Sequence, residues 1–74
     1  MKISYDREED ILMIEIKDEG IIDHAEQNGI FITHFDTDGQ ILLLEILDAS
    51  EFLSSLIKAT ISGKEQEMPF LVRS

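Results

Sequence analysis

The chain has 74 residues, with 16 acidic and 6 basic side chains, a formal net charge of −10 and no cysteine. A chain this short forms one small domain that buries only about 60% of its unfolded surface, and without cysteine neither disulfides nor thiolate metal sites can stabilise it. The excess of carboxylates predicts no binding to nucleic acid and none to an anionic membrane surface, since both require clustered lysine and arginine.

The same charge is compatible with a basic protein as partner, although its simplest role is solubility. The first ten residues, MKISYDREED, contain no apolar core of a signal sequence, and no apolar run is long enough to span a membrane. We therefore predict a cytoplasmic protein.

The first two thirds of the chain have the patterns of β-strands. Met1, Ile3 and Tyr5 alternate with polar residues, as in a half-buried strand. Asn28-Gly29 and Asp38-Gly39 are typical of hairpin turns. The expected strands cover residues 1–6, 11–17, 21–27, 30–36 and 41–47.

Residues 41–61 join the last strand to an amphipathic helix. Asp48 and Glu51 have the spacing of a capping box, in which each side chain accepts from the other residue's backbone N–H. Gly63 is placed to end the helix. Its apolar side chains follow at helical spacing: Phe52, Leu53, Leu56 and Ile57.

These elements predict an α+β fold, with an antiparallel meander of about five strands and one C-terminal helix packed on one face. Residues 1–62 would form the single domain. Residues 63–74 would form an apolar tail that is either part of an interface or disordered.

Two-residue turns also predict which strand residues share a face. A three-residue turn at Asp38-Gly39 would instead exchange the faces of the last strand. In the two-residue register the helix covers the face formed by Phe31, Thr33, Phe35, Leu42, Leu44 and Ile46.

The opposite face would keep an apolar patch, and an exposed patch of this kind usually marks an interface. We expect a homodimer, formed through this face or through the tail adding to a neighbour's sheet. The candidate interface residues are Ile30, Ile32, Ile41, Leu43, Glu45, Leu47, Phe70 and Leu71.

Five short segments form a recognisable pattern: Tyr5-Asp6, Asp10-Ile11-Leu12, Gly29-Ile30, Asp36-Thr37-Asp38-Gly39 and Glu45-Ile46-Leu47-Asp48-Ala49-Ser50. Together they make the stretch from Met1 to about Ser50 similar to the domain-of-unknown-function family 2283, a family of short prokaryotic domains. Leu43 and Met13 depart from the family, which often has glycine and an aromatic residue there. The resemblance implies a small strand-rich fold with a terminal helix, and it implies no particular activity.

Metal sites are weakly indicated. Asp36, Asp38 and Glu45 have EF-hand spacing, but His34 occupies the first ligand position and the flanks are strand-like, so we interpret the segment as a turn. His24 and His34 would point to opposite faces and could share an ion only across a dimer. We expect His34 to contact Asp23 and His24 to be solvated. No cofactor is predicted.

Glu45 is the carboxylate with apolar neighbours on its own face, a setting that favours general acid–base chemistry. We favour a structural role, in which it accepts from Tyr5 or from backbone at an interface. The predicted function is a non-enzymatic, self-associating, acidic interaction module. One alternative is an antitoxin-like partner that neutralises a small basic protein; a weaker one is a metal-binding or acid–base enzyme centred on Glu45.

Overall fold

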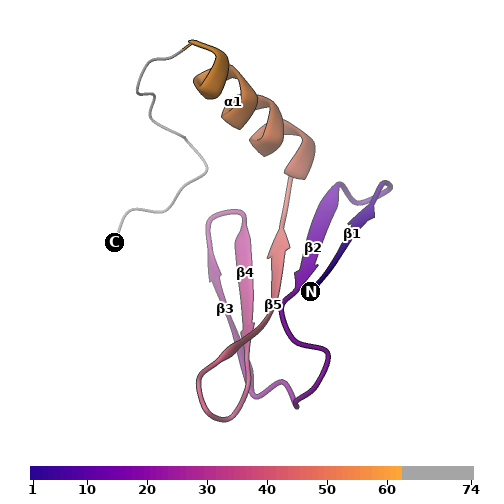
Figure 1. Ribbon diagram of the computed structural model, residues 1–74, viewed down its shortest axis with the longest axis vertical. Coiled ribbons are helices and arrows are strands. Elements are labelled where there is room, and N and C mark those ends of the chain that lie inside the picture. Colours follow the sequence, from indigo (N-terminus) through magenta and orange to yellow (C-terminus); the bar gives the residue numbers. More distant parts are fainter. Residues whose placement is uncertain (63–74) are drawn as a thin grey trace.

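The computed structural model describes residues 1–62, which form five strands and one helix. The tail predicted for residues 63–74, with Phe70 and Leu71, lies outside the described residues. The predicted α+β class is confirmed: an antiparallel five-stranded sheet is followed by one helix (Figure 1). The elements are β1 (Lys2–Asp6), β2 (Ile11–Glu15), β3 (His24–Asn28), β4 (Phe31–Phe35), β5 (Ile41–Ile46) and α1 (Ala49–Ser62).

The last strand lies at the centre of the sheet. The strand order is β1-β2-β5-β4-β3, and every neighbouring pair is antiparallel. Two hairpins, β1–β2 and β3–β4, therefore flank β5 on either side. This central position explains why residues 41–47 form a nearly continuous apolar run, since a central strand is covered more than an edge strand.

The segment between β2 and β3 crosses the end of β5. Backbone N–H groups of Ile16 and Lys17 donate to the carbonyl of Leu42, at 2.8 and 3.3 Å. Gly20 then passes directly over the Leu42 side chain with φ of +117°. A β-carbon at Gly20 would lie 3.1 Å from Cδ2 of Leu42, so only glycine fits this crossing without strain.

The predicted register is partly confirmed. Phe31 pairs with Ile46 and Thr33 with Leu44, as two-residue turn geometry predicted. In β3–β4 the pairing is shifted by two residues, which leaves the faces unchanged. A β-bulge between His34 and Phe35 pairs Phe35 with Ile41 rather than with Leu42. The bulge thereby places Ile41 opposite Phe35, away from the face on which it was expected.

Residues that lie opposite each other across neighbouring strands share a face of the sheet. One face, here called the apolar face, carries Ile3, Tyr5, Leu12, Ile14, Phe31, Thr33, Leu44 and Ile46, with Glu26 and Asn28 at the β3 edge. The other, here called the polar face, carries Lys2, Ser4, Met13, Glu15, Ala25, Gln27, Ile32, His34, Leu43 and Glu45. Apolar side chains that are exposed or half-buried lie on both faces: Ile3 and Tyr5 on the apolar face, and Met13, Ile32 and Leu43 on the polar face.

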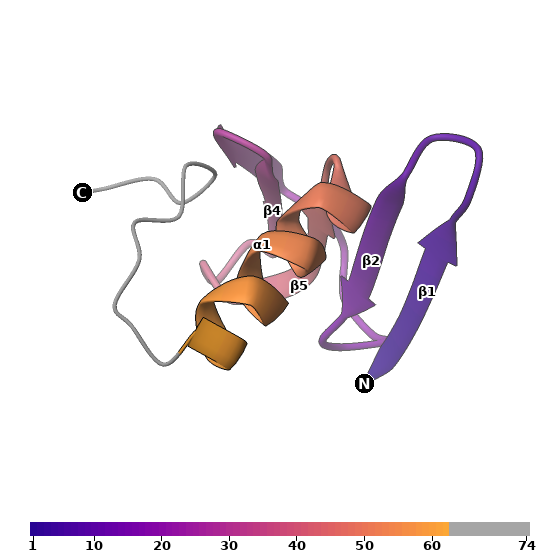
Figure 2. The same cartoon turned by 90° about the horizontal axis from the view of Figure 1, so that it is seen from above.

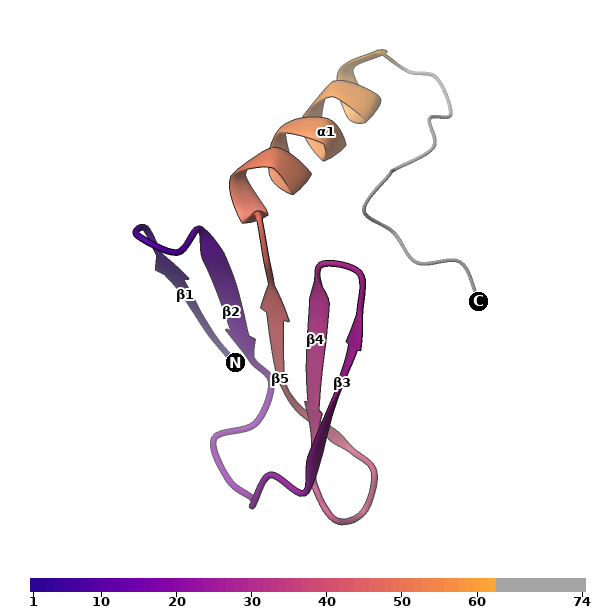
Figure 3. The ribbon, with the colours of Figure 1, turned by 180° about the vertical axis from the view of Figure 1, so that it is seen from behind.

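The contact of α1 with the apolar face is confined to its first turn. The rings of Phe52 and Phe31 meet edge to face, with centroids 5.5 Å apart, and Ala49 is buried. The rest of the helix runs beyond the end of the sheet, as Figures 1 and 3 show from opposite sides. Viewed from above, the helix axis crosses over the end of β5 (Figure 2). Within residues 1–62 the helix therefore does not provide the complete cover of the sheet that the amphipathic pattern predicted.

The core of the described residues is small. Among residues 1–62 only Leu42, Ile46 and Ala49 are buried, and no large side chain is fully enclosed. Eleven large apolar side chains are exposed. Scattered exposed apolar residues are normal, but this proportion is high for a chain of this size.

Substitution of Gly20 tests the crossing over β5. Gly20→Ala must adopt a positive φ and also displace Leu42, so we expect a loss of about 2–3 kcal/mol in unfolding free energy. Gly39→Ala is the matched control, because Gly39 has φ of +81° and a β-carbon added there would meet no atom within 4 Å. It should lose only about 1–2 kcal/mol. Urea unfolding measures both, and equal losses would contradict the Leu42 contact.

Candidate functional site

A cluster of polar side chains joins the first hairpin to the start of α1. Asp10 ends the β1–β2 turn in a left-handed conformation, with φ of +56°. Its Oδ1 accepts from the Tyr5 hydroxyl at 2.6 Å and from the Ser50 N–H at 3.0 Å. Its Oδ2 accepts from the Ser50 hydroxyl at 2.7 Å, and its carbonyl accepts from the Ala49 N–H at 3.0 Å.

Asp10 therefore caps the helix from a distant part of the chain. The first N–H groups of a helix have no partner within it, and a carboxylate also interacts favourably with the helix dipole. Asp10 satisfies the N–H of Ala49 and of Ser50 through its carbonyl and its carboxylate respectively. This tertiary cap ties β1, β2 and α1 together.

The capping box predicted for Asp48 and Glu51 does not form. Asp48 has φ of +49°, outside the extended conformation that a capping side chain needs. Its carbonyl accepts from the N–H of Phe52 at 3.1 Å, and this is the hydrogen bond with which the helix begins. Asp48 thus supplies the turn into α1, while the carboxylate that serves the helix is that of Asp10.

The cluster favours one protonation state for each of its two acids. Hydrogen bonds from Tyr5 and then from Ser50 lower the pKa of Asp10 below its ordinary value of 3.8. The hydrogen bond to Asp10 raises the pKa of Tyr5 above its ordinary value of 10.0. An ionised Asp10 and a neutral Tyr5 are stable together over a wide pH range, which suits a structural cap.

A second polar contact lies on the polar face. Nε2 of His34 lies 2.9 Å from Oε2 of Glu45, and both side chains are partly buried, at 19% and 24% exposed. The expected contacts of His34 with Asp23, and of Tyr5 with Glu45, do not form. Asp23 instead approaches His24, whose ring stacks on Phe35 at a centroid distance of 5.0 Å. The two histidines do lie on opposite faces, as predicted.

No metal site is apparent in the part of the chain that the structure describes. Among residues 1–62 no three His, Asp or Glu side chains gather as potential ligands. Oδ1 of Asp36 accepts from the backbone N–H of Asp38 and of Gln40, at 2.8 and 2.9 Å. The spacing that resembles an EF-hand therefore forms an ordinary turn, as we interpreted it.

Five of the candidate interface residues extend along the polar face and its end: Ile30, Ile32, Leu43, Glu45 and Leu47. Ile32, Leu43 and Glu45 share the polar face with charged and polar neighbours. Ile30 and Leu47 lie beyond the strand ends, where the N–H of Leu47 donates to the carbonyl of Ile30 at 2.8 Å. By alternation Ile30 and Leu47 continue the side of Ile32 and Glu45, while the bulge displaces Ile41. An interface through these residues stays a prediction.

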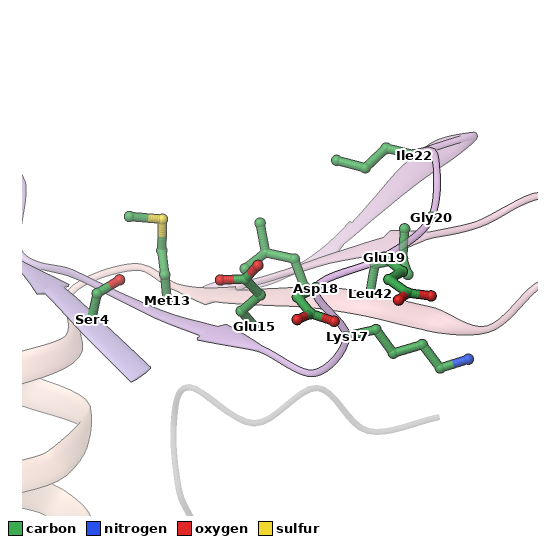
Figure 4. A pocket seen from close by; sticks show the side chains of 10 residues that line it. Ser4, Met13, Glu15, Lys17, Asp18, Glu19, Gly20, Ile22 and Leu42 are labelled. Carbon is green, nitrogen blue, oxygen red and sulfur yellow. The ribbon is translucent and has the colours of Figure 1, made fainter. Parts of the chain in front are cut away.

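A pocket of about 350 Å³ opens on the polar face, beside the segment that follows β2 (Figure 4). Ser4 and Met13 line it at one end, and Gly20 and Ile22 at the other. Its charged groups are those of Glu15, Lys17, Asp18 and Glu19, and Lys17 donates to the side chain of Gln40. Three carboxylates against one amine suit a cationic group.

The fold and the cluster define a small α+β domain whose helix is capped by a carboxylate from its first hairpin. The chain belongs to the family described as "Protein of unknown function (DUF2283)", whose model matches residues 2–50. The resemblance seen in the sequence is thereby confirmed. No curated protein and no solved structure matches the chain. The matched stretch contains the whole cap, from Tyr5 to Ser50.

The cap residues were missed as a site by pattern analysis, because Asp10 lies in a charged turn far from the helix. The signal that could have identified them is the resemblance itself, which included Tyr5, Asp10 and Ser50 without an assigned role. Within residues 1–62 no helix is both long enough and apolar enough to cross a bilayer. The cytoplasmic location stays a prediction.

Paired substitutions test which aspartate caps the helix. Asp10→Asn removes the charge and one acceptor from the Ser50 contacts, so it should clearly lower the urea midpoint of unfolding. Asp48→Asn makes the same chemical change while tolerating the left-handed turn, and should change stability by less than about 0.5 kcal/mol. A larger loss of stability in Asp48→Asn than in Asp10→Asn would show that Asp48 is the cap.

The pKa shifts predict a stability profile bounded at both ends. The stability that wild type has over Asp10→Asn should be complete above pH 3.8 and lost as the pH falls through the lowered pKa of Asp10. The stability that it has over Tyr5→Phe should be complete below pH 10.0 and lost as the pH rises through the raised pKa of Tyr5. Urea unfolding at a series of pH values measures both differences. Differences that do not change with pH would contradict the charged cap.

Proposed function

We propose that this protein is a non-enzymatic interaction module that acts by associating with a second copy of itself. The observation that supports the proposal is the small core beside a large exposed apolar surface. Only three of the described residues are buried, whereas eleven large apolar side chains are exposed. Covering such a surface is worth roughly 25 cal/mol per Å², and a second copy is one means of covering it.

The position of the exposed residues supports self-association more than their number does. Six of the eleven lie on two surfaces: Leu53, Leu56, Ile57 and Ile61 on α1, and Ile3 and Tyr5 at the β1 edge of the apolar face. The other five are Met1, Ile16, Ile21, Ile22 and Ile41. Exposed apolar residues that cluster on two surfaces of one chain favour a specific interface over non-specific aggregation.

The polar groups that could carry chemistry take part in contacts within the chain. Asp10 receives hydrogen bonds from Tyr5 and Ser50, and Glu45 lies against His34. A general acid or base must instead be free to contact a substrate. These contacts support a role in which the side chains maintain the shape of the domain, and so support the non-enzymatic part of the proposal.

A basic protein partner is the second candidate, in keeping with an antitoxin-like role. The specific observation in its favour is the pocket with three carboxylates, Glu15, Asp18 and Glu19, on the polar face. The net charge of −10 adds a long-range attraction toward such a partner. This binding would use the polar face and would leave the exposed apolar residues of α1 uncovered.

Salt dependence separates the two candidates. Two copies that each carry a net charge of −10 repel each other, so apolar association should strengthen as salt screens the repulsion. Sedimentation equilibrium of the full chain at micromolar concentration should give twice the 8.5 kDa chain mass, with a larger dimer fraction in about 0.5 M than in about 0.05 M sodium chloride. A monomer at both salt concentrations contradicts self-association. Co-purification of a small basic protein that salt removes would favour the second candidate.

A further inference from the structure

We propose that α1 is an exchanged lid: its exposed apolar side packs on the apolar face of a second copy, whose helix packs back in return. The inference rests on the self-association proposed above and specifies which surfaces of the two copies meet. The side chains concerned, here called the helix stripe, are Leu53, Leu56, Ile57 and Ile61.

The helix stripe continues a contact that already exists within the chain. Leu56 lies four residues after Phe52, and Phe52 packs on Phe31 of the apolar face. Residues three and four apart lie on one side of a helix, so Leu56 continues the side of Phe52. Leu53, Ile57 and Ile61 extend the apolar surface from Leu56 around the helix, away from the side of Phe52. There Ile57 is 57% exposed and Ile61 is 79% exposed. Most of the stripe thus turns away from the side of the helix on which Phe52 meets the sheet.

The apolar face is an incomplete partner in the same way. Phe52 contacts it at the row that contains Phe31, Ile46 and Leu12. The next row, from Ile3 through Ile14 to Leu44, lies farther from the helix and is exposed or half-buried. Each copy thus presents one uncovered helix and one uncovered row of strand residues.

The area of the helix stripe supports packing of the stripe on the apolar face of the second copy. The four side chains of the helix stripe supply on the order of 400 Å², about half of the roughly 800 Å² that each partner buries in a stable dimer. Two stripes packed only against each other would therefore form a small interface. A stripe packed on the apolar face, together with its symmetric counterpart, reaches the usual size.

The dimensions also match. The 14 residues of α1 span about 21 Å at 1.5 Å per residue. Five strands at about 4.8 Å spacing span about 20 Å. One two-fold axis can place each helix on the other copy's sheet, and this closes the assembly at two copies.

The cap fixes the direction in which the helix is presented. Asp10 binds the N–H of Ala49 and of Ser50, so the first turn of α1 is anchored to the β1–β2 hairpin. These bonds fix where the helix begins relative to the sheet, and its later turns run beyond the end of the sheet (Figure 1). It is thereby held outward, where a second copy can receive it.

Disulfide trapping between two variants tests the inference. The chain has no cysteine, so Ile3→Cys and Ile57→Cys each carry a single thiol. Mixed and oxidised at micromolar concentration, the two full-length variants should form the mixed Ile3→Cys/Ile57→Cys disulfide as the main product by mass spectrometry. Ile22→Cys is the matched control, since Ile22 is 52% exposed against 61% for Ile3 but lines the pocket on the polar face. It should react with Ile57→Cys at least about fivefold less.

The products also separate failure of this inference from failure of the proposed function. A dimer in which Ile57→Cys pairs mainly with itself, or pairs equally with Ile3→Cys and Ile22→Cys, overturns the exchanged lid while self-association stands. A monomer overturns both, including the case in which residues 63–74 of the same chain cover the stripe.

Charge substitutions on α1 give a second, independent measurement. Ile57→Asp places a carboxylate in the helix stripe, and Ser55→Asp places the same charge on the opposite side of the helix. We expect the first to weaken the dimer at least about tenfold and the second by less than about threefold. Circular dichroism establishes that both retain α1. Equal weakening by both variants would overturn the role of the stripe.

Discussion

One carboxylate connects the two ends of the described structure. Asp10 and Ser50 are forty residues apart, yet they meet because β2 pairs directly with β5, and α1 begins three residues after β5 ends. Tyr5 adds the edge strand to the same cluster. The arrangement of the helix relative to the sheet therefore depends on this cap rather than on burial of the helix, which supplies little beyond Phe52 and Ala49.

A helix held at its start and free along most of its length has a different role from a helix that covers a sheet. Its apolar side does not complete the core of its own chain, and the core of the described residues remains small. In the proposed dimer the hydrophobic effect would act between molecules as well as within one. Stability and association would then be coupled, as in many small domains that fold fully only as oligomers.

The family match divides the chain in an informative way. It covers residues 2–50, which include all five strands and every residue of the cap, and it ends where α1 begins. The helix stripe lies beyond the matched stretch. The matched stretch of this chain thus contains the sheet with its capping carboxylate, while the surface proposed for association lies mostly in the segment that follows it.

The sequence by itself determined the strands, the helix, the central turns and the family, because alternation, helical spacing and glycine-containing turns are local signals. It also predicted the pairing of Phe31 with Ile46, but this pairing results from a three-residue turn between Asp36 and Gln40 whose shift the bulge offsets. Only the tertiary structure decided that β5 is central, that a bulge displaces Ile41, and that Asp10 replaces Asp48 as the cap. Each of these depends on contacts between residues far apart in the chain. Local patterns describe which side of an element is apolar, but the partner that covers that side depends on how the whole sheet is assembled.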